Sequence, residues 1–120
     1  MKTIFVVDDN NVNLLKAENA LADEYNVITL ASVDLMFEAI EKVKPDLILL
    51  DIVMPWVNGF DALGKLKENP EYKDIPVIFL TSKTDENTKK RGFDMGIVDM
   101  INKPFTEQLL LDRVKAQLEK

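Results

Sequence analysis

Five residues of types that can carry out phosphoryl transfer follow short apolar segments of the chain. They are three carboxylates, one hydroxyl and one amine, namely Asp8, Asp9, Asp51, Thr81 and Lys103. A carboxylate oxygen can attack a phosphoryl group to give an acyl phosphate, and Asp51 stands where such a nucleophile would emerge from a buried strand. A hydroxyl and an ammonium can contact the phosphoryl oxygens, on which negative charge develops. Each of these residues alone is common in turns or on protein surfaces, so the hypothesis of a phosphoryl-transfer site depends on all five lying together.

The acidic residues of this set also indicate a cation. Asp8 and Asp9 are adjacent, and bringing Asp51 beside them is unfavourable unless a positive charge neutralises the cluster. Mg²⁺ prefers oxygen ligands and usually takes one or two carboxylates together with phosphate oxygens. Asp8-Asp9 could instead cap a following helix, but Asn10-Asn11 could supply that cap equally well.

Composition excludes several other kinds of site. The chain has 120 residues with neither Cys nor His, which rules out disulfides, thiol catalysis, imidazole bases and ordinary zinc sites. The length fits one domain, and the net charge of -6 opposes sequence-independent nucleic-acid binding. No apolar run approaches a membrane span and no signal-peptide pattern is visible, so we expect a cytoplasmic protein with no membrane partner.

Nearly continuous apolar runs predict strands that are buried on both faces of a parallel sheet. These runs cover residues 4–7, 27–30, 47–50, 77–80 and, more weakly, 98–101. Pro45 is expected to end the second helix and Pro76 to open the fourth strand, while Asn58-Gly59 is typical of a turn.

The segments between these strands follow helical spacing. The predicted apolar stripes are Leu14, Ala17 and Leu21, then Met36, Ala39, Ile40 and Val43, and finally Leu111, Val114 and Leu118. A helix over residues 85–95 is the poorest, because Lys89, Lys90 and Arg91 interrupt any stripe and Gly92 lowers helix propensity. We interpret it as a thinly packed, charged helix, with a mobile partner-binding face as the alternative.

This alternation of strands and helices predicts an α/β fold with right-handed crossovers and helices on both faces of the sheet. In such a sheet the carboxyl ends of the strands point to one rim, where ligands usually bind. The five candidate residues are therefore expected to converge there.

The pattern as a whole resembles the receiver domain of two-component response regulators, over essentially all of residues 1–120. The motifs that carry this resemblance are Asp8-Asp9, the segment 51–55 with Asn58-Gly59 behind it, Thr81-Ser82 and Lys103-Pro104-Phe105. The separations of 43, 30 and 22 residues that link Asp8, Asp51, Thr81 and Lys103 are also similar to the family's spacing.

The resemblance implies a doubly wound, flavodoxin-like sheet of five parallel strands in the order 2-1-3-4-5, with five helices. It implies that Asp51 is the phosphoacceptor and that Asp8, Asp9, Asp51 and the backbone carbonyl of Val53 surround Mg²⁺. Thr81 and Lys103 would contact the phosphoryl oxygens, and the Lys103-Pro104 peptide bond would be cis. The phosphoryl donor would be a histidine kinase or phosphotransfer protein, the recipient of the signal a downstream output protein or domain, and the only catalysis the protein's own phosphorylation and dephosphorylation.

The chain departs from the family pattern at several positions. Met100 stands where an aromatic residue is usual, so we expect looser coupling between Thr81 and the neighbouring surface. Ile97-Val98 makes the predicted output surface more apolar. Neither Val53 nor Lys83 is suited to orienting a hydrolytic water, and slow self-dephosphorylation is the expected consequence.

Three alternatives remain open. A haloacid-dehalogenase-like phosphatase needs a second acid two positions after its nucleophile, where this chain has Val53. A flavodoxin-like cofactor binder would not place Asp8-Asp9 against a phosphate. A receiver-like interaction module that signals without phosphorylation fits the altered position Met100.

Overall fold

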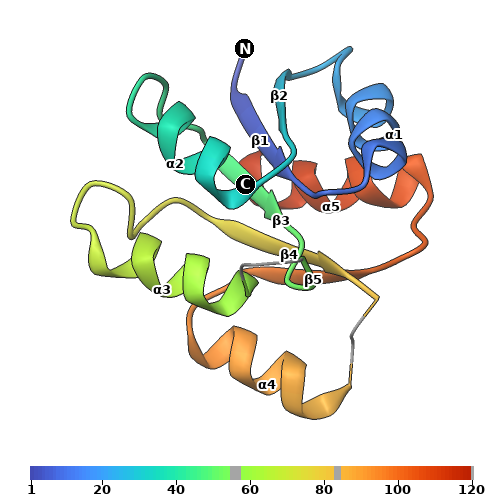
Figure 1. Ribbon diagram of the computed structural model, residues 1–120. Helices are drawn as coiled ribbons and strands as arrows, with labels where there is room; N and C mark the ends of the chain where they lie inside the picture. The colour runs from blue at the N-terminus through green and yellow to red at the C-terminus, as the bar shows by residue number, and fades with distance from the viewer. Residues whose placement is uncertain (55–57, 83–84, 120) are drawn as a thin grey trace.

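The computed structural model describes residues 1–54, 58–82 and 85–119. Five parallel strands form one sheet in the order β2-β1-β3-β4-β5 (Figure 1). The strands are β1 (Thr3–Val7), β2 (Asn26–Leu30), β3 (Leu47–Leu50), β4 (Val77–Thr81) and β5 (Asp99–Asn102). The helices between and after them are α1 (Asn11–Leu21), α2 (Val33–Ile40), α3 (Gly59–Glu68), α4 (Glu86–Asp94) and α5 (Glu107–Leu118). The predicted fold class and strand order are confirmed.

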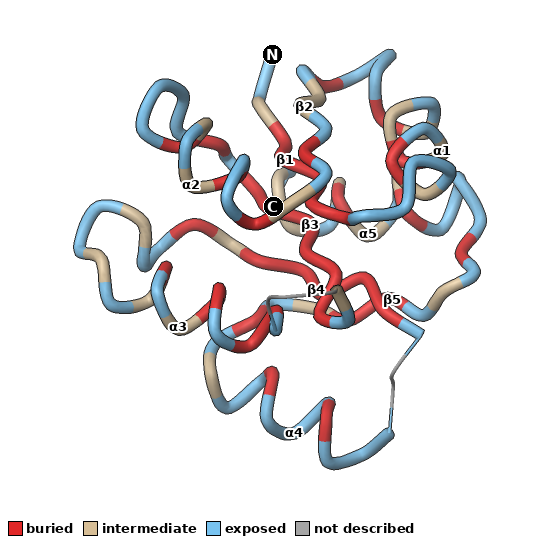
Figure 2. The backbone as a smooth tube through the Cα atoms, in the orientation of Figure 1, coloured by how far each residue is buried: buried red, intermediate tan, exposed pale blue. Residues whose placement is uncertain are grey.

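Helices cover both faces of the sheet and enclose two separate hydrophobic clusters. On one face α1 and α5 pack side by side, and Leu14 and Val114 join strand residues in a common cluster. On the other face α2 and α3 pack against the sheet, with Met36 and Leu63 among the buried residues. Buried residues follow the central strands, whereas the outer sides of the helices are exposed (Figure 2). The sheet is therefore the buried support for the loops at its carboxyl rim.

Each described helix begins at a side-chain cap. Asn10 is the cap of α1, and its Oδ1 accepts the Val12 N–H at 2.9 Å. Asn58 caps α3 in the same way, accepting the Phe60 N–H at 2.7 Å, and Gly59 is the first helical residue. The pair Asn58-Gly59, which we interpreted as a turn signal, thus begins α3, because the Asn oxygen satisfies a backbone donor of the helix. Ser32, Asp85 and Thr106 are the caps of α2, α4 and α5.

The edges of the sheet and the end of α2 differ from the sequence prediction. Strand β2 is not buried on both faces, because it lies at the sheet edge with Val27 and Ile28 only half-buried. Strand β5 begins one residue later than predicted and leaves Val98 exposed. Helix α2 ends at Ile40, where the Lys42 N–H tightens the turn by donating to the Ala39 carbonyl at 3.0 Å, so Val43 is exposed instead of continuing the stripe.

The first residue of α3 lies directly behind the loop that follows β3. A Cβ atom added to Gly59 would lie 2.5 Å from the Ile52 Cα and 2.9 Å from the Asp51 carbonyl oxygen. We therefore expect Gly59→Ala to lower the free energy of unfolding by about 1–3 kcal/mol, the usual cost of overpacking. Gly64→Ala is the matched control, since its Cβ would meet only the Met95 Cε, at 3.9 Å.

Urea unfolding of both variants tests this expectation. Because alanine has the higher helix propensity, Gly64→Ala should be unchanged or more stable by up to about 1 kcal/mol. Equal stability of the two variants would show that the backbone at Asp51 and Ile52 adjusts to the added methyl group without a loss of stability.

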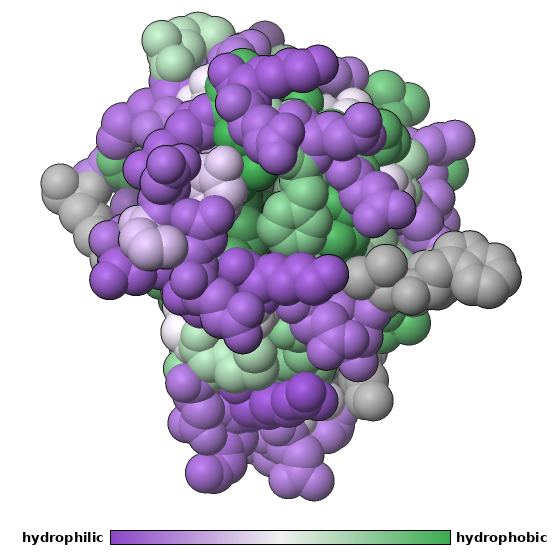
Figure 3. Space-filling view, turned by 60° about the vertical axis from the view of Figure 1, so that its left-hand side comes forward, coloured by the Kyte–Doolittle hydropathy of each residue, from purple (hydrophilic) through white to green (hydrophobic). Residues whose placement is uncertain are grey.

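The surface of the domain is predominantly polar. On the side shown in Figure 3, hydrophilic side chains surround a small apolar area. Within residues 1–54, 58–82 and 85–119, no helix combines the length and apolar character needed to cross a membrane.

Candidate functional site

Strand register brings the predicted site residues to one rim of the sheet. Val7 of β1 pairs with Leu50 of β3, so the next residues, Asp8 and Asp51, are neighbours. The ladder continues past the strand ends, because the Asp51 N–H donates to the Val7 carbonyl at 3.0 Å. On the other side Thr81 pairs with Asn102, which places Lys103 directly beyond β5. Residues that are far apart in the chain therefore meet because their strands are parallel and end together.

Lys103 joins two of the carboxylates. Its Nζ lies 2.5 Å from Asp8 Oδ2 and 3.0 Å from Asp51 Oδ2. Both acids are almost fully buried, with 1% of Asp8 and 4% of Asp51 exposed. A buried carboxylate is stable only with a partner, and here the single ammonium of Lys103 pairs with two carboxylates. The site thus keeps a negative charge that the ammonium does not balance.

The other oxygen of each buried carboxylate accepts a backbone N–H two residues further along the chain. Asp8 Oδ1 accepts from Asn10 N at 2.9 Å, and Asp51 Oδ1 accepts from Val53 N at 3.0 Å. These two turns fix the orientation of both side chains and direct each Oδ2 to Lys103. Sequence reasoning did not predict this arrangement, although an Asp at the start of a loop is its usual signal.

The environment of Asp51 disfavours its charged form. Burial raises the pKa of the Asp51 carboxyl above its usual value, and the nearby Asp8 acts in the same direction. The Val53 N–H and the Lys103 ammonium lower this pKa but do not offset the burial. An additional cation at the rim would favour the charged, nucleophilic form.

The three acids suit a hard divalent cation. One oxygen each from Asp8, Asp9 and Asp51 can be chosen so that all lie within 4.8 Å of one another. Asp9 is exposed while the other two are buried, so the cluster opens to solvent on one side. An all-oxygen set with room for water is the kind of donor set that Mg²⁺ prefers. Val53, the fourth predicted ligand, is an exposed residue beside Asp51.

The sequence of this chain matches a known protein family over most of its length. Response regulator receiver domains match residues 4–115. The chain belongs to this family.

Curated relatives of this receiver domain are longer proteins. It is 38% identical over 117 residues to a probable cyclic di-GMP phosphodiesterase of Vibrio cholerae, with 98% of this chain and 26% of the relative covered. It is 36% identical over 122 residues to the phosphate regulon transcriptional regulatory protein PhoB of Pseudomonas aeruginosa, with 99% of this chain and 52% of PhoB covered. The chain thus spans about a quarter to a half of the length of these relatives.

A solved structure agrees over nearly all of the chain. Chemotaxis protein CheY4 of Vibrio cholerae superimposes with a TM-score of 0.92 at 27% identity, and the match covers 98% of each chain. The fold and the family are therefore both supported.

Two further predicted features of the receiver domain, Thr81 and the bond after Lys103, lie at or just beyond the ends of β4 and β5. Thr81 is fully buried at the end of β4, and the Lys103-Pro104 peptide bond is cis, as predicted. Met100, at the position where an aromatic residue is usual in the family, is buried in the cluster beneath α2 and α3. Lys83 lies outside the described residues.

A contact behind Lys103 was not foreseen from the sequence. Phe105 is buried two residues after it, and the Nζ of Lys16 on α1 lies 4.7 Å from the centre of the Phe105 ring. The pair connects α1 to the segment that carries Lys103. Apolar spacing could not reveal it, because Lys16 is charged.

We predict that Asp51→Asn makes the metal-free domain more stable at pH 7. A carboxyl with a raised folded-state pKa destabilises the fold at pH values above that pKa, because it must be charged where charge is disfavoured. The penalty disappears as the pH falls below the unfolded-state pKa, so the gain from asparagine should disappear there too. Thermal unfolding in EDTA between pH 3 and pH 7 measures this, and a less stable variant at pH 7 would contradict it.

Proposed function

We propose that this receiver domain is the phosphoacceptor of a two-component relay and that Asp51 takes the phosphoryl group. The observation that carries the proposal is the meeting of Asp51 with Lys103 and two further carboxylates at one solvent-accessible rim. Signalling is then the function, and the only chemistry is the gain and loss of the protein's own phosphoryl group. We further infer that residues 1–120 make up one receiver domain.

The reaction follows from the placement of these groups. An Asp51 oxygen forms a bond to phosphorus while the bond between phosphorus and a donor nitrogen or oxygen breaks. Lys103, 3.0 Å from Asp51 Oδ2, lies where it can contact a phosphoryl oxygen as charge builds up. The hydroxyl of Thr81 at the adjacent strand end would contact another oxygen and connect phosphorylation to β4.

Asp8, Asp9, Asp51 and the Val53 carbonyl would hold Mg²⁺. Bound there, the ion would supply positive charge that neutralises the acids and phosphoryl oxygens. Without it, a phosphodonor would meet a cluster that carries three acids and one ammonium. Phosphorylation should therefore depend on the metal.

The partners of this proposed function are proteins. A histidine kinase or phosphotransfer protein would supply the phosphoryl group, and a downstream output protein or domain would read the response. The relatives include a transcriptional regulator and a probable phosphodiesterase, so the kind of output varies among similar chains. Direct nucleic-acid binding by this acidic domain is not expected, and its cytoplasmic location stays a prediction.

The test is incubation with acetyl phosphate and Mg²⁺, followed by intact-mass measurement. The proposal predicts a single added phosphoryl mass that is lost when EDTA replaces Mg²⁺. A receiver-like module that signals without phosphorylation predicts no added mass under either condition. Absence of the adduct in correctly folded protein would therefore favour that alternative.

The metal assignment makes a separate prediction for Asp9. Because Asp9→Asn removes one negative charge and one ligand oxygen, we expect the affinity for Mg²⁺ to fall by about tenfold or more. Isothermal titration calorimetry on the unphosphorylated protein measures this directly. Asp23→Asn, an exposed change just before β2 at the opposite end of the sheet, is the matched control. Unchanged affinity in Asp9→Asn would exclude Asp9 from the metal site.

A further inference from the structure

Helix α4 is attached to the rest of the domain by few buried side chains. Only Thr88 and Gly92 of its residues are buried, and its large apolar residue Phe93 is exposed. Gly92 lies against the sheet so closely that an added Cβ would be 2.7 Å from Ile97 Cδ1 and 3.2 Å from the Phe79 ring. The helix thus touches the sheet without inserting any large apolar side chain into the core. Such a helix gains little from burial and depends on its remaining contacts.

An open groove separates α4 from α3. It has a volume of about 550 Å³, and Gly64 and Met95 are among its lining residues. Lateral packing between the two helices is incomplete along this groove. Any side chain that crosses from α4 to α3 therefore has a large share in holding α4 in place.

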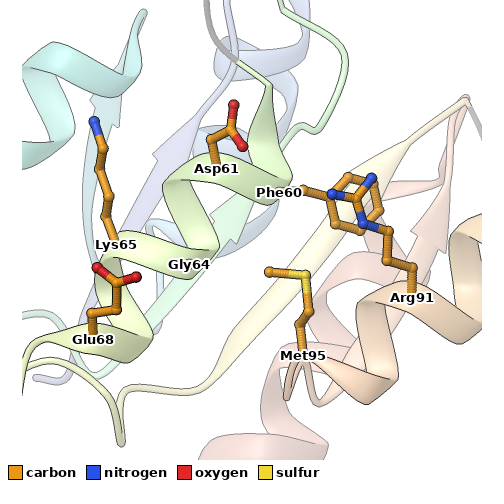
Figure 4. A pocket seen from close by; sticks show the side chains of 7 residues that line it. All are labelled: Phe60, Asp61, Gly64, Lys65, Glu68, Arg91 and Met95. Atoms are coloured by element: carbon orange, nitrogen blue, oxygen red, sulfur yellow. The ribbon is translucent and has the colours of Figure 1, made fainter.

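Arg91 makes such a contact. Its guanidinium carbon lies 4.0 Å from the centre of the Phe60 ring, and Figure 4 shows the guanidinium in front of that ring. Among the described residues Arg91 takes part in no ion pair, so the ring is its main partner. Flat stacking of guanidinium on an aromatic face is a contact that arginine makes better than lysine.

The ring beneath Arg91 is firmly held. Phe60 is buried and meets Phe79 edge to face, with 5.4 Å between ring centres and an angle of 87°. Phe79 is fully buried on β4, two residues before Thr81, and also touches the position of Gly92. The stack therefore ties α4 both to α3 and to the strand that ends at the candidate site.

We propose that the Arg91–Phe60 stack is a latch that holds α4 against α3 and sets how readily α4 leaves the sheet. Exposed cation–π contacts have strengths equivalent to about a two- to fivefold change in an equilibrium constant. Loss of the stack should raise the open population of α4 by that factor. The effect should be confined to α4, because the rest of the core does not depend on Arg91.

Hydrogen exchange on the unphosphorylated chain tests the latch. The amides of Met95, Gly96 and Ile97 donate to carbonyls of α4 and report on its opening. In Arg91→Ala these amides should exchange about two- to fivefold faster, while the Leu110 amide of α5 keeps its parent rate. Alanine has the higher helix propensity, so propensity alone would change the rates in the opposite direction.

Lys89→Ala is the matched control. It removes one positive charge from an exposed position of the same helix and changes propensity similarly. Its α4 rates should equal those of the parent. Equal α4 rates in Arg91→Ala and Lys89→Ala would overturn the latch, as would equal acceleration of α4 and α5 in Arg91→Ala.

The connection of the latch to phosphorylation rests on the proposed function. In that function Thr81 connects phosphorylation to β4, whose Phe79 contacts Phe60 and lies against Gly92 of α4. The latch would oppose this rearrangement, so Arg91→Ala should react with acetyl phosphate about two- to fivefold faster than the parent. Lys89→Ala should react at the parent rate. Equal phosphorylation rates in the parent and both variants would show that the latch does not affect phosphorylation. Absence of any phosphorylation would contradict the proposed function, and the hydrogen-exchange rates would then test the latch by themselves.

Discussion

Asp51→Asn is expected to take up no phosphoryl group from acetyl phosphate, while the parent gains one. The amide has the size of the carboxylate but is not a nucleophile at neutral pH, and Asp51 is the carboxylate that follows β3 and contacts Lys103. The same variant is expected to fold and to be more stable, so loss of reaction cannot be attributed to unfolding. Intact mass after incubation with acetyl phosphate and Mg²⁺ measures the result.

Asp61→Asn is the control for this experiment. Asp61 is an exposed acid in the first turn of α3, outside the acidic cluster. It should be phosphorylated at the parent rate. Undiminished phosphorylation of Asp51→Asn would show that another residue is the acceptor.

Lys103→Met should impair both the reaction and the fold. Lys103 is 15% exposed and pairs with two buried acids, so its loss leaves charges without a partner. Breaking such buried pairs typically costs about 3–5 kcal/mol, and removing one group that stabilises developing charge costs about 10²–10³ in rate. Urea unfolding in EDTA and the rate of mass gain with Mg²⁺ measure the two effects.

The pH dependence of Lys103→Met separates electrostatics from packing. Lys103 lowers the pKa of the Asp51 carboxyl, so Asp51 is harder to ionise without the ammonium. The loss of stability should therefore be largest at neutral pH and should shrink as Asp51 becomes protonated in acid. Lys44→Met, at an exposed position, should behave like the parent at every pH. A loss of stability in Lys103→Met that is independent of pH would show that the ammonium does not stabilise the acids.

The sequence predicted that the site residues lie together, because their meeting depends only on the order of the strands and on where each strand ends. Asp51 and Lys103 follow apolar runs that are easily recognised, and a parallel sheet brings such positions together. The orientation of the carboxylates could not be predicted in this way. It depends on the backbone N–H of Val53 and of Asn10, which every residue other than proline can provide.

The errors of the sequence prediction have related physical causes. Val27 belongs to an apolar run, from which we predicted burial on both faces of the strand. That prediction was wrong, because an edge strand lacks one neighbour and is less covered. The thin packing of α4 was predicted correctly from its charged residues. The stacking of Arg91 on Phe60 was not predicted, because helical spacing predicts the face of the helix on which a side chain lies but not which ring it contacts.

Two departures from the family pattern lead to further predictions. Met100 is buried, and looser coupling between Thr81 and the surrounding surface stays a prediction. Slow self-dephosphorylation also stays a prediction, since Val53 is exposed beside the acceptor and Lys83 lies outside the described residues.

Chemical mapping of the phosphoryl group is the most direct test that Asp51 is the phosphoacceptor. Borohydride reduces an aspartyl phosphate to homoserine, so protein phosphorylated by acetyl phosphate and Mg²⁺ can be reduced, digested and sequenced by mass spectrometry. We expect homoserine at position 51, with unmodified Asp8 and Asp9. Homoserine at another position, or a phosphoryl group that resists reduction on a hydroxyl such as that of Thr81, would contradict it.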